Sequence, residues 1–277
     1  MFKKLLLSIG VIGVVITPTI SMGAKLNNDE DFYESRYCDA GTYIEKSEAI
    51  NYDHKETTYL YNIASGVPAY TPASNLNNNC ANVAGAVVVG YYDRFCENLM
   101  PNYTSYIKLG SKIIYKNQTA TAVTSVMSSL YDLMDTNIGG VGTTFQGYQQ
   151  GMSRYAQNCG YTYTSESTMN GSNIDIEKYR ASVTAEKPVS IFLTAYSFYS
   201  KTVTANGTDT IYYNYSSVGH VVVGYGYYVE TYYNSLNQII TTRTYLHVAG
   251  GQNGFQDCYL CLDGKSSIYS AVSATIQ

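Results

Sequence analysis

Two side chains in this sequence have the types needed for nucleophilic catalysis, a cysteine at residue 80 and a histidine at residue 220. Cys80 follows three asparagines and precedes a run of small and apolar residues, so it stands where a polar loop enters a buried helix. A thiol at a helix N-terminus lies at the positive end of the helix dipole, which lowers its pKa and favours the thiolate. The alternative is that Cys80 is a small hydrophobic side chain used for packing.

A cysteine nucleophile needs a base, and the chain has three histidines, His54, His220 and His247. His54 lies in a charged segment, where we expect a solvated surface side chain, and His247 lies within "TYLHVAGG", where we expect a buried structural role. His220 follows a Ser-Ser-Val-Gly turn and begins the apolar segment "VVVGYGYY". The first position of a core strand has a rigid backbone and an open end, which suits a general base. The sequence therefore predicts a Cys80–His220 pair.

The elements that would position this pair follow in a simple order. Apolar spacing, capping residues and glycines predict helices over 80–98, 119–134, 143–160 and 174–184. After Pro188 the pattern changes to strands separated by turn residues, over 189–199, 219–233, 239–251, 258–264 and 268–276. Helices first and strands second predict an α+β fold with two lobes.

The segments "CANVAGAVVVGYYD" and "GHVVVGYGY" resemble those of papain-like cysteine peptidases, nearest the secreted bacterial group similar to bacteriocin-leader peptidases. The tail "YLHVAGGQNGFQDCYLCLDG" is also similar to streptopain-type enzymes. This resemblance implies a papain-like two-lobed fold with the helical lobe first and an antiparallel β lobe second. It implies that Cys80 is the nucleophile and His220 the base of a thiol peptidase that hydrolyses peptide bonds.

The resemblance also implies two further groups, and the sequence departs from the family at both. The oxyanion hole would use the Cys80 backbone N–H and a side-chain amide, for which Asn75 is the candidate because Ser74 occupies the family's glutamine position. An Asn or Asp should orient the imidazole, and Asn253 is the candidate, ahead of Gln252. These departures leave open a catalytically degenerate papain-like binding or adhesion module. A cell-wall amidase or acyl transferase is the further alternative.

The start of the chain predicts secretion. Residues 1–24 contain two lysines, a long apolar run and a small residue at the end, as in a signal peptide. The apolar run at 5–20 is shorter than the roughly 20 residues that span a bilayer, which counts against a membrane anchor. Residues 25–58 are polar and weakly patterned, a candidate pro-segment cleaved between 25 and about 60, and 59–277 would form the peptidase domain. We expect a secreted, extracellular protein, with cell-surface association as a variant.

Composition limits the partners. The chain carries 17 basic and 21 acidic residues and no basic cluster, which gives no electrostatic case for nucleic acid. We expect a monomer that acts on polypeptide substrates without a cofactor and without a membrane once the signal is removed. Six cysteines are too few for a disulfide-stapled scaffold of this length. The single CxxC of Cys258 and Cys261 is a weak zinc signal, and we predict a structural role and no metal.

Overall fold

The computed structural model describes residues 43–61, 63–140 and 142–277 of the 277-residue chain. The predicted signal peptide at 1–24 and residues 25–42 of the polar segment lie outside the described residues. The helices are α1 Cys80–Tyr92, α2 Thr121–Leu133, the short 3₁₀ helix Ile138–Gly140, α3 Phe145–Asn158 and α4 Ile176–Thr184. The strands are β1 Ile44–Asn51, β2 His54–Tyr61, β3 Tyr106–Leu109, β4 Lys112–Tyr115, β5 Tyr163–Ser167, β6 Met169–Asn170, β7 Asn173–Ile174, β8 Val189–Ala205, β9 Thr208–Ser216, β10 His220–Tyr233, β11 Ile239–Gln252, β12 Phe255–Cys261 and β13 Ser267–Ile276.

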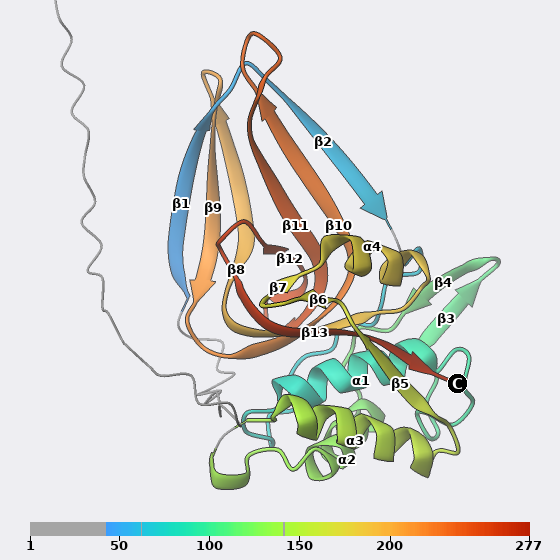
Figure 1. Cartoon of the computed structure of the whole chain (residues 1–277). Coiled ribbons are helices and arrows are strands. Elements are labelled where there is room, and N and C mark those ends of the chain that lie inside the picture. Colours follow the sequence, from blue (N-terminus) through green and yellow to red (C-terminus); the bar gives the residue numbers. More distant parts are fainter. Residues whose placement is uncertain (1–42, 62, 141) are drawn as a thin grey trace, which may run out of the picture. The chain divides into compact units, whose positions relative to one another are not determined.

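The predicted fold, a helical lobe followed by an antiparallel β lobe, is wrong. The described part of the chain is mostly antiparallel sheet, and its main sheet has nine strands. Seven of these follow the order β1-β9-β8-β12-β11-β10-β2, with β13 and β5 attached through β8. Two of the nine, β1 and β2, precede the first helix and form the ends of the seven-strand path (Figure 1).

The sequence pattern does not predict β1 and β2, because they are edge strands. Among the described residues β1 pairs only with β9 and β2 only with β10, and both strands carry charged side chains, as edge strands do to prevent further pairing. Six of the eight residues in β1 are exposed, so the strand has no hydrophobic face for a pattern to reveal. The domain boundary expected at residue 59 falls inside β2. A cut between 44 and 60 would therefore fall within or next to two strands that are paired in the sheet.

The predicted helices match the structure more closely. Helix α1 begins at Cys80, as expected, and ends at Tyr92, six residues before the predicted end at 98. All thirteen of its residues are buried, because α2 and α3 pack on it from one side and β10 and β11 from another. A Cβ on Gly85 would lie 3.0 Å from the Leu130 side chain, so close packing of α1 on α2 requires a small residue there.

β8 and β10 are paired over only part of their length, and the main sheet branches where this pairing ends. The two strands pair from Val189 to Leu193 against His220 to Gly224, and beyond His220 β8 continues with β9 on its edge. The β11–β12 pair joins β10 on one side and contacts β8 on the other at Leu260. His220 therefore stands at the point where two long strands diverge, next to the helical layer.

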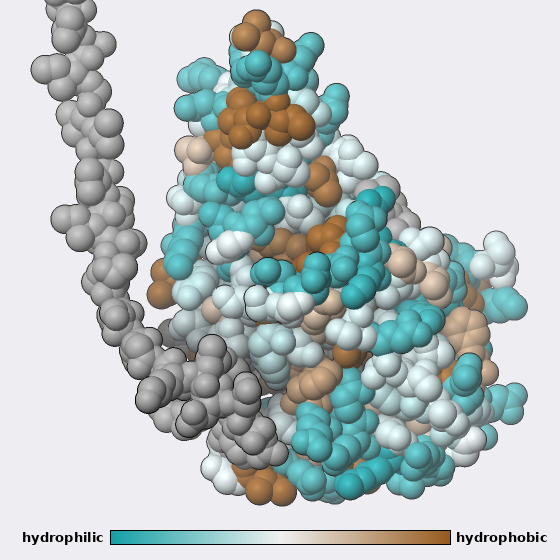
Figure 2. All heavy atoms as spheres, in the orientation of Figure 1, coloured by the Kyte–Doolittle hydropathy of each residue, from teal (hydrophilic) through white to brown (hydrophobic). Residues whose placement is uncertain are grey.

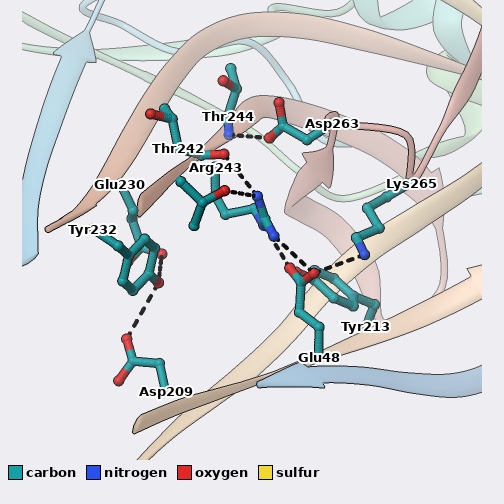
Figure 3. Close-up of polar contacts among 11 residues, drawn as sticks. Glu48, Asp209, Tyr213, Glu230, Tyr232, Thr242, Arg243, Thr244, Asp263 and Lys265 are labelled. Atoms are coloured by element: carbon teal, nitrogen blue, oxygen red, sulfur yellow. Dashed lines mark hydrogen bonds and ion pairs between the residues drawn. The ribbon is translucent and has the colours of Figure 1, made fainter. Parts of the chain in front are cut away.

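Away from the helices, partly buried ion pairs connect strands of the sheet (Figure 3). Glu48 of β1 accepts hydrogen bonds from Arg243 of β11 at 2.7 Å and from Lys265 at 2.9 Å. Burial raises the pKa of Glu48, but these hydrogen bonds outweigh that effect and lower it to about 2. Asp209 of β9 pairs with Lys55 of β2 at 2.7 Å. These contacts join strands from both ends of the sheet.

The hairpin between β10 and β11 ends in an exposed apolar patch. Leu236, Ile239 and Ile240 are 75%, 63% and 47% exposed, and Figure 2 shows hydrophobic atoms gathered at that end of the sheet. Among the residues placed by the structure, no helix is both long enough and apolar enough to cross a membrane.

Candidate active site

The Cys80 thiol lies at the first position of α1. The helix starts there because Asn78 has a positive φ of 53° and Asn79 leaves the helical path, so the asparagine loop ends at the cysteine. The first hydrogen bond within the helix runs from Val83 N–H to the Asn79 carbonyl. The backbone N–H groups that precede Val83 in the first turn therefore have no acceptor within the helix. Cys80 is 3% exposed. The predicted position at a helix N-terminus is confirmed.

His220 is the first residue of β10, as predicted, and is 2% exposed. Its Nε2 lies 2.6 Å from the carbonyl oxygen of Gly250. Because a carbonyl can only accept, we infer that Nε2 carries the proton in this contact, which leaves Nδ1 as the nitrogen for proton exchange. Nδ1 is buried and has no hydrogen-bond partner within the described ranges. The contact with Gly250 therefore orients the ring and leaves Nδ1 as the nitrogen without a partner in the described part of the chain.

Aromatic rings fix the plane of the His220 imidazole. The Tyr196 ring lies 5.1 Å from it and the Phe198 ring 6.4 Å, the latter nearly perpendicular. Gln252 donates from Nε2 to the Tyr196 hydroxyl at 3.1 Å, and its Oε1 accepts from Tyr43. This aromatic wall, Tyr196 and Phe198, excludes water from one side of the ring and limits its rotation.

The two candidate catalytic residues belong to segments that pack together. A Cβ on Gly251 would lie 3.2 Å from Cγ1 of Val83, which is in the first turn of the helix that Cys80 begins. The preceding residue, Gly250, holds His220 through its carbonyl. The β11 end therefore touches the first turn of α1 at Gly251 and His220 at Gly250. Gly251 has a φ of 66°, a conformation that favours glycine, which explains the Gly-Gly pair.

The two amides expected from sequence to complete the site are differently placed. Asn253 is exposed in the turn between β11 and β12, and the group bonded to His220 is instead the Gly250 carbonyl. Asn75 is also exposed, in a turn before α1. Asn79 is 1% exposed beside Cys80, and its Nδ2 donates to the Ala73 carbonyl at 3.1 Å. Asn79 is therefore a buried side-chain amide directly before Cys80 in the chain, whereas Asn75 and Asn253 are exposed.

Sequence reasoning missed Gly250, Tyr196 and Asn79, each for an identifiable reason. A backbone carbonyl has no residue-type signature, so nothing in the letters marks Gly250 as a hydrogen-bond acceptor. Tyr196 is one of 31 tyrosines. Asn79 was treated as part of a turn, although its place directly before the cysteine could have drawn attention to it.

The other described cysteines have environments that oppose reactivity. Cys258 and Cys261 lie on β12, and burial raises the pKa of both thiols. Burial also raises the pKa of Cys96 and Cys159, of which Cys159 is the more exposed. Across the described ranges no three His, Cys, Asp or Glu side chains gather as a metal-binding group.

Comparisons with known proteins give no further guidance. No protein-family model matches the chain, and neither a curated protein nor a solved structure matches it.

Proposed function

We propose that this protein is a thiol hydrolase of peptide bonds in which Cys80 is the nucleophile and His220 the base. The observation that carries the proposal is the 2.6 Å contact of His220 Nε2 with the Gly250 carbonyl, which orients the ring and leaves buried Nδ1 without a hydrogen-bond partner among the described residues. The second support is the contact between Gly251 and Val83, which brings the end of β11 to the first turn of α1. A base oriented by a fixed acceptor and a thiol at a helix start are the parts that nucleophilic catalysis requires.

The steps follow from these two groups. His220 Nδ1 takes the proton of the Cys80 thiol, and the thiolate attacks the carbonyl carbon of the peptide bond. The oxyanion accepts hydrogen bonds from the Cys80 backbone N–H and from Nδ2 of Asn79. The imidazolium then returns its proton to the leaving amine as the C–N bond breaks, which leaves a thioester. Water, deprotonated by Nδ1, attacks the thioester and releases the acid and the thiol.

The Gly250 carbonyl takes the part that an Asn or Asp side chain would have. It accepts from Nε2–H and stabilises the imidazolium through its dipole, but it carries no full charge. The pair therefore depends on backbone geometry at Gly250 and Gly251 for its orientation. Both reacting side chains are almost fully buried, so a substrate reaches the thiol only after the covering residues move.

Thiol reactivity tests the proposal directly. The natural secreted protein is treated with iodoacetamide at near-neutral pH, and modification of each cysteine is followed by mass spectrometry. We expect Cys80 to react faster than Cys159, which is more exposed but has a pKa raised by burial. His220→Ala should remove this difference. Labelling of Cys80 slower than that of a thiol in the denatured chain would contradict an activated nucleophile.

One observation favours a second function, a binding module on a catalytically silent scaffold. Cys80 and His220 are 3% and 2% exposed, as structural residues would be. This alternative predicts no turnover of any peptide library and unchanged partner binding in Cys80→Ala. Hydrolysis that the wild type performs and Cys80→Ala loses would exclude it.

A further inference from the structure

A two-stranded hairpin lies apart from the main sheet and carries both apolar and basic side chains. Strands β3 and β4 pair with each other over residues 106–115 and, in the described part of the chain, with no strand of the main sheet. Figure 1 shows this hairpin extending away from the helices. Its two-residue turn begins at Gly110, where φ is 61° and where a Cβ would meet no described atom within 4 Å beyond its chain neighbours. The tip of the hairpin therefore faces open space.

The base of the hairpin is anchored on α1. The Ser105 hydroxyl donates to the Gly90 carbonyl at 2.6 Å, and the hydroxyl of buried Tyr115 donates to the Tyr91 carbonyl at 3.1 Å. The Lys116 N–H donates to the Ser105 carbonyl at 2.8 Å and closes the base of the pair. None of these contacts involves the tip, so substitutions of exposed tip residues should leave the protein folded.

One face of the hairpin is apolar and exposed. Ile107 lies opposite Ile114 on the paired strand. Leu109 lies opposite Lys112, and because residues two apart in a strand share a face, these four side chains stand on one side of the hairpin. Ile107, Leu109 and Ile114 are 49%, 59% and 38% exposed. Three large apolar side chains that adjoin on a projecting hairpin form a patch, and such patches are typical of binding surfaces.

The same hairpin is a small positive region of an acidic protein. The whole chain has 17 basic and 21 acidic residues, but residues 98–131 contain three lysines, Lys108, Lys112 and Lys116, and no acidic residue. Glu186 lines a surface hollow together with Lys108, but its carboxylate is paired with Arg94 at 3.1 Å. Lys108 and Lys112 flank the turn, so positive charge is concentrated at the tip, next to the apolar face.

We propose that the β3–β4 hairpin docks the protein on an anionic phospholipid bilayer. The three apolar side chains enter the boundary between headgroups and acyl chains, and the ammonium groups of Lys108 and Lys112 reach lipid phosphates through their flexible stems. A bilayer requires apolar and positive side chains together on a projecting element but no complementary shape, and the hairpin supplies this combination. The proposal departs from the expectation of a mature protein without a membrane, which considered only segments long enough to span a bilayer.

Charge distinguishes this hairpin from the apolar patch at the β10–β11 turn. Leu236, Ile239 and Ile240 are also exposed, but residues 231–242 contain no charged side chain. Each lysine close to an anionic membrane strengthens binding about fivefold. An acidic protein that approaches such a membrane is therefore oriented with β3 and β4 toward the lipid, and the β10–β11 turn provides a matched control.

Tryptophan fluorescence tests the proposal, because the chain has no tryptophan of its own. Leu109→Trp places a probe on the hairpin, and Leu236→Trp places one on the control patch. Each secreted full-length variant is mixed with vesicles of equal parts phosphatidylglycerol and phosphatidylcholine, and with vesicles of phosphatidylcholine alone. We expect a blue shift of the emission for Leu109→Trp with the anionic vesicles and none for Leu236→Trp. An unchanged Leu109→Trp spectrum, or equal shifts of both variants, would overturn the proposal.

Cosedimentation with the same vesicles measures the contribution of charge. Replacing both tip lysines, Lys108→Gln with Lys112→Gln, should weaken binding to the anionic vesicles about 25-fold, whereas Lys108→Arg with Lys112→Arg should retain it. Added salt should weaken wild-type binding by screening. Circular dichroism checks that each variant is folded. Equal binding of the glutamine and arginine variants would contradict docking through charge. Binding of polyglutamate without binding of either vesicle would show that the partner is an acidic polypeptide instead.

Discussion

His220 and His247 lie on adjacent strands of one sheet, but their surroundings differ in kind. His220 is 2% exposed, one of its nitrogens faces a backbone carbonyl, and its other nitrogen has no partner among the described residues. His247 is partly exposed, and a single nitrogen, Nε2, meets both a phenol and a carboxylate. The first arrangement leaves one ring nitrogen without a partner in the described residues, whereas the second joins three side chains by hydrogen bonds. The two histidines therefore have different environments although their strands are adjacent.

The largest expected effect separates the two histidines by activity. His220→Ala should lower peptide turnover at least about 10³-fold, because the nucleophile loses its base, and Cys80→Ala should match it since the two act as one unit. His247→Ala should keep the wild-type rate. Turnover on a casein or peptide library measures all three variants. A loss confined to His247→Ala would reverse the assignment of the two sites.

The second prediction concerns what holds His220. A Cβ on Gly250 would lie 2.1 Å from the Phe255 carbonyl oxygen, so Gly250→Ala must shift the backbone whose carbonyl orients the imidazole. We expect turnover to fall about tenfold or more and stability to fall by about 1–3 kcal/mol. Asn253→Ala is the control, and because Asn253 is exposed it should change stability by less than about 0.5 kcal/mol and leave the rate unaltered. Urea unfolding and turnover are measured together, and a slow Asn253→Ala enzyme would restore the side-chain amide expected from sequence.

Aromatic contacts to the two rings should differ in their consequences. Tyr196→Leu removes the ring 5.1 Å from His220 and should slow turnover by a factor of about 2 to 10, in line with an aromatic contact of about 0.5–1.5 kcal/mol. Tyr259→Leu removes the ring stacked on His247 and should leave turnover unchanged. Equal effects of both variants on turnover would show that the ring beside His220 has no special role in catalysis.

The smallest expected effect is on the pH dependence of stability, which should differ between the two hydrogen-bond acceptors, the Asp257 carboxylate beside His247 and the Gly250 carbonyl beside His220. The hydrogen bond from His247 lowers the pKa of Asp257, so its stabilising contribution is complete above the unfolded value of about 4 and is lost as pH falls through the lower folded value. The Gly250 carbonyl does not titrate. Between pH 5 and pH 2, the wild type should therefore lose more unfolding free energy than Asp257→Asn, by at most about 1 kcal/mol because the carboxylate is mostly exposed. Urea unfolding at both pH values checks this, and parallel losses would show that the pair adds no stability.

Local signals in the sequence were reliable where the elements are buried. The Thr144 hydroxyl caps α3 by accepting from Gly147 N–H, as its position before the helix indicated. The start of α1 at Cys80 and of β10 at His220 also follow from the change from turn residues to apolar residues. These features depend on a few neighbouring residues, so a pattern can reveal them. The polar edge strands β1 and β2 have no such pattern, and their omission led to the wrong order of lobes.

The sequence by itself determined the nucleophile candidate, the base candidate and most of the buried helices and strands, because residue type and short-range spacing encode them. Tertiary structure alone decided that residues 44–61 belong to the sheet, that a carbonyl at Gly250 replaces the expected side chain of Asn253, and that Tyr225, His247 and Asp257 meet. Each of these depends on which distant strands pair and in which register. Strands pair through backbone N–H and C=O groups, which nearly all residue types carry, and the paired residues are far apart in the chain. The residue types therefore do not show which strands pair.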